Sequence, residues 1–171
     1  NQIVTDKVWH ELAFGLESLG YDTPTIRRRV AEMASFFGIQ TWFYKSVTEL
    51  SGGQKQLLNL ASVMVLQPKV LILDEPTSQL DPIAASDFLA TLGKINRELG
   101  TTIILTEHRL EEAFSFASRV AVMDGGRLLC SGTPAEVGAE LKSSGNAMFL
   151  AMPAAMRIWA ATDSKAVCPI S

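Results

Sequence analysis

Apolar residues recur at helical spacing near the start of the chain. The first set comprises Val8, Leu12, Leu16 and Leu19, with Trp9 and Ala13 beside them. Positions three and four apart share one face of an α-helix, so this set predicts an amphipathic helix whose apolar face packs into a core. Gly20 follows the last apolar position, where glycine commonly ends a helix.

A second helical pattern follows after a short gap. Its apolar positions are Ile26, Val30, Met33 and Phe37. Thr23 and Pro24 form a favourable pair for the N-cap and the first helical position, and Gly38 is expected to end the helix. Core packing is again the expected role of the apolar face.

Short apolar runs alternate with helical patterns in the middle of the chain. The runs cover residues 70–73, 102–105 and 120–123, and the helical patterns cover 81–100 and 110–117. The first run is partly β-branched and lies between Pro68 and Asp74, as is typical of a strand buried in a parallel sheet. Strands that alternate with helices predict an α/β fold with a mainly parallel sheet and flanking helices.

Local signals predict where several of these elements begin and end. Asp81 and Pro82 are expected to open the helix over 81–100, and Gly100 is expected to close it. Its buried face is expected to contain Phe88, Leu89, Leu92 and Ile95. Further along the chain, Asp124-Gly125-Gly126 predicts a hairpin that leads into a strand over 128–131.

A last short helix is expected after this hairpin. Thr133 and Glu136 are three residues apart with Pro134 between them, which is the pattern of a capping box.

The composition indicates a globular protein without a nucleic-acid partner. Of the 171 residues, 47% are hydrophobic and 19% are charged, which allows a core to be buried. The formal net charge is −3, whereas nucleic-acid-binding domains are usually basic. Arg27 to Arg29 form a basic cluster, for which a solvated helix face is the simplest interpretation.

Cysteine spacing and hydropathy argue against two further classes of protein. Cys130 and Cys168 are far apart and show no metal-binding spacing, so neither a disulfide framework nor a zinc site is expected, and a reducing compartment fits. The apolar segment 147–161 contains Pro153 and Arg157 and is shorter than the roughly 20 residues that span a bilayer. We therefore expect neither a signal peptide nor a transmembrane helix.

A Ser-Gly-Gly turn offers the first candidate for chemistry. Ser51, Gly52 and Gly53 run directly into a helix that is expected to start near Gln54. Unhindered backbone N–H groups at a helix N-terminus bind phosphate oxygens. Such a turn is more often only a turn, so this feature by itself is weak evidence for a phosphate site.

Two carboxylates follow the strand over 70–73. Asp74 and Glu75 are expected at the carboxyl edge of the sheet, where ligands of open α/β folds bind. One carboxylate can hold Mg²⁺, directly or through water, while the other polarises an attacking water. A helix cap is the structural alternative, but Pro76 directly after the pair favours a fixed turn.

His108 also lies just past a predicted strand. An imidazole there can hydrogen-bond a terminal phosphate or help to hold the attacking water. His10, within the first predicted helix, is expected to be structural.

Three motifs in this order resemble the second half of an ATP-binding cassette (ABC) ATPase. They are LSGGQ at 50–54, LILDEPTSQLD at 71–81 and TEHRLEEA at 106–113, and the resemblance covers about residues 5–137. It implies a partial P-loop NTPase fold of the ABC type with ATP and Mg²⁺ as cofactors.

The resemblance also implies roles for single residues. Ser51, Gly52, Gly53 and Gln54 would form the signature that contacts the γ-phosphate of ATP held by a partner domain. Asp74 would be the Walker B carboxylate on Mg²⁺, Glu75 the general base and His108 the switch histidine. The loop from Ser78 to Asp81 would communicate across a dimer of two such domains and approach the nucleotide through Asp81.

The sequence departs from the family pattern in three places. No stretch has the form GxxxxGK[ST], so the phosphate-binding loop is missing, and the chain is expected to begin just after the glutamine loop of a cassette. The chain by itself is therefore expected to be inactive. The text after the signature reads QKQLLNLASVM where Arg-rich text is usual, and Gln79 stands where a small residue is usual.

The opening text, NQIVTDKVWHELAFGLESLG, is similar to the ATPase components of energy-coupling-factor transporters, which take up vitamins, cobalt or nickel. FLAMPAAMRIW at 149–159 resembles the linker between two ATPase domains fused in one chain. This implies a helical subdomain at 1–50, a catalytic α/β core at 51–138, and an extension or linker at 139–171.

The same resemblance implies an ATP-hydrolysing subunit of an importer, at the cytoplasmic face of the membrane. Its partners would be a second ATPase domain, a transmembrane coupling protein and a substrate-binding membrane component. Two alternatives remain. One is a soluble ABC ATPase of DNA repair or translation, and the other is an inactive fragment that acts only in dimerisation.

Overall fold

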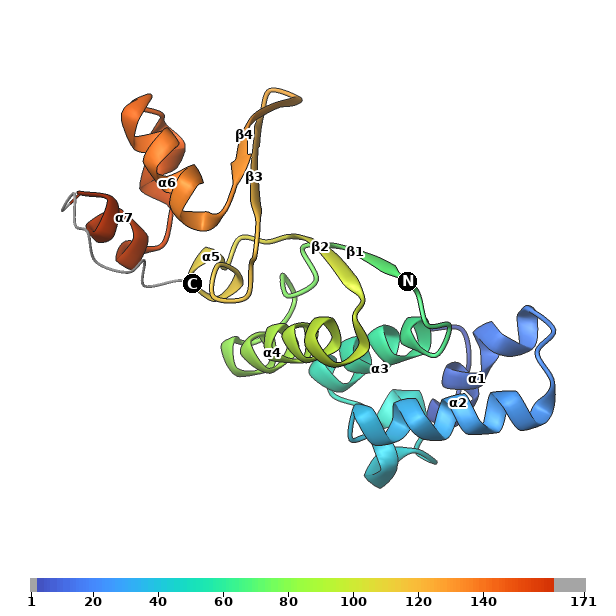
Figure 1. Ribbon diagram of the computed structural model, residues 1–171. Coiled ribbons are helices and arrows are strands. Elements are labelled where there is room, and N and C mark those ends of the chain that lie inside the picture. The colour runs from blue at the N-terminus through green and yellow to red at the C-terminus, as the bar shows by residue number, and fades with distance from the viewer. Residues whose placement is uncertain (1–2, 162–171) are drawn as a thin grey trace. The chain divides into compact units, whose positions relative to one another are not determined.

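The computed structural model describes residues 3–161 and divides the chain into two compact units. The first unit ends at Thr106 and the second begins at Glu107. Figure 1 shows the elements of both units along the chain. Cys168, for which we expect neither a disulfide nor a metal role, lies outside the described residues.

The described part of the first unit contains four α-helices, two 3₁₀-helices and a pair of strands. In chain order these are α1 (Val8–Ser18), α2 (Thr23–Phe36), η1 (Ile39–Trp42), η2 (Val47–Glu49), α3 (Gly52–Met64), β1 (Val70–Asp74), α4 (Pro82–Leu99) and β2 (Thr102–Thr106). One hydrophobic cluster joins the buried faces of these helices to Leu71 of β1. The first unit therefore has a core of its own.

Both helices predicted at the start of the chain are confirmed, with small corrections at their ends. Helix α1 ends at Ser18, and Leu19 is 65% exposed instead of lying in the buried stripe. Trp9 is also partly exposed, because the buried face contains Val8, Leu12 and Leu16 without it. The N-cap of α2 is Asp22 and not Thr23, which is already the first helical residue.

Helix α4 has the ends that its sequence predicts. The Asp81 carboxylate accepts hydrogen bonds from the N–H groups of Ile83 (3.0 Å) and Ala84 (2.9 Å), which satisfies two donors of the first turn. Gly100 closes the helix in the left-handed conformation, with φ of 68°. The predicted buried face is confirmed by Phe88, Leu89, Leu92 and Ile95.

Strands β1 and β2 are parallel and directly paired, with Asp74 opposite Thr106 at their carboxyl ends. The prediction of a strand buried on both faces is wrong. Leu71 packs into the core, but Ile72 on the other face is 72% exposed. The reason is that α3 and α4 lie on one side of the strand pair, and no described element of this unit covers the other side (Figure 1).

The second unit consists of a hairpin and short helices. Its elements are α5 (Leu110–Ala113), β3 (Val120–Asp124), β4 (Arg127–Gly132), α6 (Pro134–Ser143), η3 (Ala147–Ala151) and α7 (Ala154–Ala161). The predicted hairpin is confirmed: Gly125 and Gly126 form its two-residue turn, with φ of 53° and 74°. Thr133 and Glu136 form the predicted capping box at the start of α6.

The predicted α/β fold is confirmed, but its described strands form two pairs instead of one mainly parallel sheet. Among the described residues, β1 and β2 form a parallel pair, and β3 and β4 form a separate antiparallel pair. The antiparallel pairing of β3 and β4 agrees with the predicted hairpin, because a turn of two residues can join only antiparallel strands. The helix predicted over 110–117 is also shorter and ends at Ala113.

The segment 149–159 takes part in the core of the second unit. Met152 and Met156 are buried in a cluster with Val137 and Leu141 of α6. Helix α6 also runs across the proposed boundary between residues 138 and 139. The division into a helical subdomain, a catalytic core and a linker remains a prediction about function.

None of the helices in the described range 3–161 combines the length and the apolar character that crossing a bilayer requires.

A buried carboxylate anchors the N-terminal segment of the first unit. Glu11 of α1 is only 5% exposed. Its Oε2 atom accepts hydrogen bonds from the N–H groups of Val4 (3.0 Å) and Thr5 (2.8 Å) and from Thr5 Oγ1 (3.0 Å). Lys7 then forms a β-bridge with Ser46, so this segment is held against the helices at two points.

Replacing Glu11 with alanine is expected to release this segment, because two backbone donors lose their acceptor. The local free energy of opening should fall by about 1–3 kcal/mol. Amide hydrogen exchange in a peptide covering residues 3–12 measures this change. Glu17→Ala on the exposed face of α1 is the matched control, and equal exchange in both variants would contradict the anchoring role of Glu11.

Candidate functional site

The Ser-Gly-Gly turn is the first turn of α3. The helix begins at Gly52, two residues earlier than the sequence predicts, and Ser51 is its N-cap. Ser51 Oγ accepts a hydrogen bond from the N–H of Gln54 (3.2 Å), and Gln54 Oε1 accepts one from the N–H of Ser51 (3.0 Å). This capping box places both glycines at the positive end of the helix dipole.

The two glycines have different surroundings. A Cβ atom on Gly52 would meet no atom within 4 Å, so the helix terminus is open beside it. A Cβ atom on Gly53 would come within 3.2 Å of the Cβ of Ala84 on α4. Glycine at 53 thus allows the start of α3 to approach the start of α4 closely. The exposed helix terminus at Ser51 and Gly52 can accept an anion from outside.

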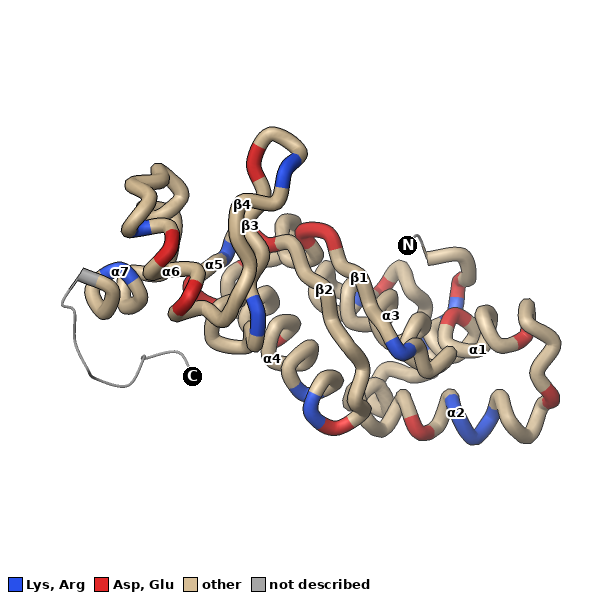
Figure 2. The backbone as a smooth tube through the Cα atoms, turned by 45° about the horizontal axis from the view of Figure 1, so that its top comes forward, with Lys and Arg blue, Asp and Glu red and all other residues tan. Residues whose placement is uncertain are grey.

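The carboxylate pair lies at the carboxyl end of β1, as predicted. Both Asp74 and Glu75 are exposed, and Figure 2 shows acidic positions where β1 ends. Asp74 is the last residue of the strand and Glu75 the first residue beyond it. Carboxyl ends of parallel strands are the edge at which open α/β sheets bind ligands.

The backbone at Glu75 is in an uncommon conformation. Its φ angle is 43°, in the left-handed region that non-glycine residues seldom adopt. The N–H of Glu75 donates to the carbonyl oxygen of Thr106 (3.0 Å) and to Thr106 Oγ1 (3.1 Å). Non-glycine residues in this region are found at functional sites where the surrounding structure holds them. Thr106 supplies part of that support.

The Thr106 hydroxyl also contacts the carboxylate of Asp74. Thr106 Oγ1 donates a hydrogen bond to Asp74 Oδ1, and the two residues are register partners across the strand pair. Sequence reasoning gave this threonine no role of its own, although it begins the third motif. The sequence indicated this contact only indirectly. The two residues are 32 positions apart, and only the parallel register of β1 and β2 brings them together.

A second residue that sequence reasoning missed connects α3 to the loop after β1. Gln56 Nε2 donates a hydrogen bond to the carbonyl oxygen of Pro76 (2.9 Å). Pro76 follows the carboxylate pair directly, and Thr77 beyond it is completely buried. Helix α3 and the loop after β1 are therefore fixed to each other within the first unit. No local pattern in the sequence indicates this contact.

The loop from Ser78 to Asp81 joins β1 to α4. Ser78 and Gln79 are exposed, so the unusual glutamine faces solvent in this unit. Asp81 uses Oδ1 to cap α4, as described above. Its assignment as a nucleotide-contacting residue remains a prediction, whereas its predicted role in starting the helix is confirmed.

His108 belongs to the second unit, two residues beyond the end of β2. The side chain of Glu107 accepts hydrogen bonds from the backbone N–H groups of His108 (3.0 Å) and Arg109 (3.4 Å). These bonds hold the turn that leads into α5. The structure thus brings Ser51, Asp74 and Glu75 into the first unit and describes His108 within the second.

His10 has local partners on α1. Its Nε2 atom lies 3.5 Å from Glu17 Oε2, and its ring stacks on Trp9 with centroids 5.2 Å apart. These contacts agree with the structural role predicted for it.

The donor set near Asp74 fits Mg²⁺ bound together with a nucleotide. Magnesium keeps several waters and usually takes one or two carboxylates plus substrate phosphates. Asp74 can supply such a carboxylate from an exposed strand end. No group of three or more His, Cys, Asp or Glu side chains that could hold a metal gathers anywhere in residues 3–161.

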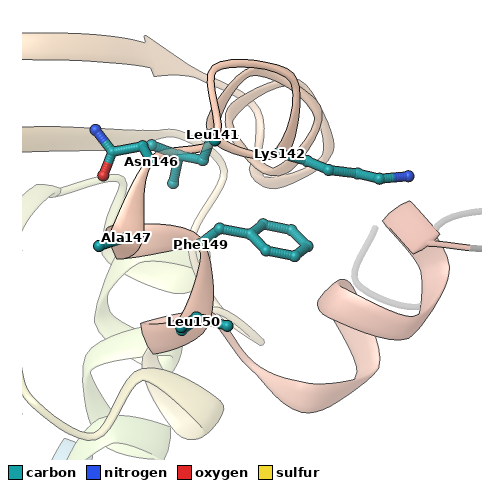
Figure 3. A pocket seen from close by; sticks show the side chains of 7 residues that line it. Leu141, Lys142, Asn146, Ala147, Phe149 and Leu150 are labelled. Atoms are coloured by element: carbon teal, nitrogen blue, oxygen red, sulfur yellow. The ribbon is translucent and has the colours of Figure 1, made fainter.

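A hollow in the second unit is a weaker candidate for a ligand site. It has a volume of about 260 Å³ and lies between α6 and the segment 145–150 (Figure 3). Two of its polar groups bond within the chain: Lys142 Nζ donates to the carbonyl oxygen of Ala160, and Asn146 Oδ1 accepts from the N–H of Met148. The remaining lining is apolar and includes Phe149 and Leu150.

Comparisons with known proteins give the site its context. The family profile described as ABC transporter matches residues 3–78. A putative ABC transporter ATP-binding protein of Bacillus anthracis is 55% identical over 141 residues, which cover 82% of this chain. The energy-coupling factor transporter ATP-binding protein EcfA1 of Caldanaerobacter subterraneus subsp. tengcongensis is 42% identical over 144 residues, or 83% of this chain.

A solved structure is similar over most of the chain. CbiO1 of Clostridium perfringens, described as part of the ABC transporter complex cbiONQ, aligns with a TM-score of 0.75 and 35% identity over 93% of this chain. All three proteins are longer than the aligned region. The match spans 26% of the Bacillus anthracis protein, 51% of EcfA1 and 63% of CbiO1.

Proposed function

Because this chain belongs to the ABC transporter family of ATP-binding domains and is similar to energy-coupling-factor ATPases, we propose that it supplies most of the catalytic residues of an ATP-hydrolysing importer subunit. The observation that carries this proposal is the arrangement within the first unit. A capped glycine turn opens α3, and the carboxylate pair ends β1, with Gln56 joining the two regions. These groups match the signature and the Walker B region of the family.

Hydrolysis requires one group that activates water and others that hold the phosphates. Glu75 is the proposed general base, since its carboxylate lies at the sheet edge and can accept a proton from the attacking water. Asp74 would hold Mg²⁺, which when bound neutralises charge on the phosphate oxygens. His108 would hydrogen-bond the terminal phosphate. Each assignment rests on the match of these residues to the family motifs.

The signature would act on a nucleotide held by another domain. Ser51 and Gly52 are exposed at the positive end of α3 and can approach the γ-phosphate bound by a partner. The Ser51 hydroxyl accepts from Gln54 in the capping box and keeps its own proton to donate to an oxygen of the phosphate. Two domains would therefore close around two ATP molecules, with Asp81 and its loop between them.

Nucleotide binding needs residues beyond those of this chain. The form GxxxxGK[ST] does not occur in these 171 residues, so the backbone cradle and the phosphate lysine must come from elsewhere. We propose that this chain by itself does not hydrolyse ATP. We call a longer protein that carries this chain after the first half of a cassette the complete gene product. In it, that preceding half would provide the cradle.

The proposed process is uptake of a vitamin or a transition-metal ion. Closure of the two ATPase domains would act on a transmembrane coupling protein, and a separate membrane component would bind the solute. The ATPase would then lie at the cytoplasmic face of the membrane. The named relatives support this assignment, because one is an energy-coupling-factor ATPase and another is part of the cbiONQ complex. The solute would not be encoded in this chain.

The alternatives are a soluble ABC ATPase and an inactive fragment that acts only in dimerisation, called the remnant below. Purification of the complete gene product under mild detergent separates them. We expect it to copurify with a hydrophobic membrane protein and to hydrolyse ATP in an Mg²⁺-dependent manner. The 171-residue chain serves as the negative control.

The result decides between the three functions. Hydrolysis without any membrane partner would favour the soluble class, and a membrane partner without hydrolysis would favour the remnant. Hydrolysis by the 171-residue chain alone would contradict the need for a separate phosphate-binding loop.

A further inference from the structure

We propose that Thr106 is a positioning residue. Its hydroxyl orients the carboxylate of Asp74, the proposed metal ligand, and supports the backbone of Glu75, the proposed general base. This inference rests on the proposed function of Asp74 and Glu75, and it assigns a role to a side chain that lies outside the family motif containing the carboxylates. Thr106 is the last residue of β2, directly across the strand pair from Asp74.

The hydroxyl of Thr106 serves both carboxylate residues at once. Thr106 Oγ1 donates its proton to Asp74 Oδ1 and accepts a hydrogen bond from the N–H of Glu75 at 3.1 Å. A hydroxyl carries one proton and two lone pairs, so a single atom can make both bonds. The two hydrogen bonds therefore run in one direction, from the N–H of Glu75 through the Thr106 hydroxyl to the Asp74 carboxylate. Both are polarised toward the negative charge.

The two bonds act on different features of the site. The bond to Asp74 restrains the rotation of its carboxylate, which lies at an exposed strand end. The bond from Glu75 helps to hold a backbone with φ of 43°, an uncommon angle for a non-glycine residue. The orientation of the Asp74 carboxylate would determine how it binds Mg²⁺. The backbone of Glu75 would determine where the Glu75 carboxylate contacts the attacking water.

The backbone alone does not provide the same restraint. The carbonyl oxygen of Thr106 also accepts from the N–H of Glu75, and any residue at this position would keep that bond. The bond to Asp74, in contrast, needs the side-chain hydroxyl of Thr106 as its donor. A valine has the same shape and an equally good strand propensity, but it lacks the hydroxyl. Thr106→Val thus removes the proposed function of the side chain and leaves the strand intact.

Partners that orient metal ligands have a measurable influence on metal affinity. Removing one typically lowers metal affinity or activity about 10- to 100-fold. For the exposed Thr106 we expect the lower end, about a tenfold rise in the half-saturating Mg²⁺ concentration of Thr106→Val. ATP binding without metal should stay unchanged, because the Thr106 hydroxyl bonds to the proposed metal ligand Asp74 and to the backbone N–H of Glu75.

The experiment uses the complete gene product that carries these residues, with four variants. Thr106→Val and Thr106→Ala both remove the hydroxyl, and Thr106→Ser restores it. Thr102→Val is the matched control, because Thr102 occupies the same strand at its other end, opposite Val70. The readouts are the Mg²⁺ dependence of ATP turnover and, independently of turnover, the Mn²⁺ affinity of the ATP-bound protein by electron paramagnetic resonance.

The expected result is weaker metal binding in Thr106→Val and Thr106→Ala, with wild-type behaviour in Thr106→Ser and Thr102→Val. Unchanged metal affinity in both hydroxyl-free variants would overturn the inference, as would a loss in Thr106→Ser as large as that in Thr106→Val. A wild-type protein that binds Mn²⁺ and ATP without hydrolysis would contradict the proposed function, while the metal readout would still decide the role of Thr106.

Discussion

Replacing Glu75 with glutamine in the complete gene product is expected to lower ATP turnover by about 10²- to 10⁴-fold, while ATP binding persists. The amide has nearly the same size and shape as the carboxylate, but it cannot take a proton from water. The backbone bonds from Glu75 to Thr106 do not involve the side chain of Glu75, so the local fold should remain. The variant should therefore accumulate as an ATP-bound dimer.

The measurement compares turnover with dimer formation in the presence of Mg-ATP. Size-exclusion chromatography should show a nucleotide-dependent dimer for Glu75→Gln and a transient one for the wild type. Glu98→Gln, on the exposed end of α4, is the matched control and should keep wild-type turnover. Turnover of Glu75→Gln close to the wild-type rate would exclude Glu75 as the general base.

Replacing Ser51 with arginine is expected to stop hydrolysis without preventing nucleotide binding. Ser51 is exposed at the start of α3, where the phosphate of the partner's ATP is proposed to lie. The substitution places a long side chain in that space and removes the Oγ acceptor of the capping box. Loss of a donor to the charge that develops in the transition state costs about 10²- to 10³-fold in turnover. We expect a reduction of at least about a hundredfold.

The same substitution at a second capping-box serine controls for the effect on the fold. Ser46 caps η2 in the way that Ser51 caps α3, so Ser46→Arg also loses a capping acceptor and gains the same bulk. Loss of an N-cap costs about 1 kcal/mol in either case. Only Ser51→Arg should lose turnover. Binding of a fluorescent ATP analogue should be normal in both variants.

Comparison of Ser51→Arg with Ser46→Arg also tests whether the nucleotide site is shared between two ATPase domains. If Ser51→Arg loses nucleotide binding, the signature contacts ATP of its own domain and the two-domain site is wrong. If Ser51→Arg hydrolyses ATP at the rate of Ser46→Arg, the start of α3 does not face a phosphate during turnover.

Short-range signals in the sequence were sufficient for the ends of several elements. Asp81 and Gly100 mark both ends of α4, and Gly125-Gly126 marks the hairpin turn. Each of these features depends on bonds and steric limits within a few residues, so the local sequence contains the whole cause. The order of the three motifs likewise indicated the family, since each motif is a contiguous stretch of the chain.

Errors arose where the outcome depends on the surroundings of an element. Trp9 lies beside the apolar stripe of α1 but is 41% exposed, because periodicity does not determine how wide the buried face will be. Ile72 belongs to a strongly apolar strand but is exposed, because helices pack on one side of that strand only. The position of a residue in the apolar pattern indicates on which face of its helix or strand it lies. The packing of other elements decides whether that face is covered.

The sequence by itself thus determined the motif residues, both ends of α4 and the hairpin turn, all of which follow from local hydrogen bonds and backbone sterics. Only the tertiary structure decided the contacts of Thr106 with Asp74 and of Gln56 with Pro76, and the burial of Met152 and Met156. These features join residues that are distant in the sequence. Their energies depend on strand register and helix packing, which the chain reaches only when many weak contacts form together.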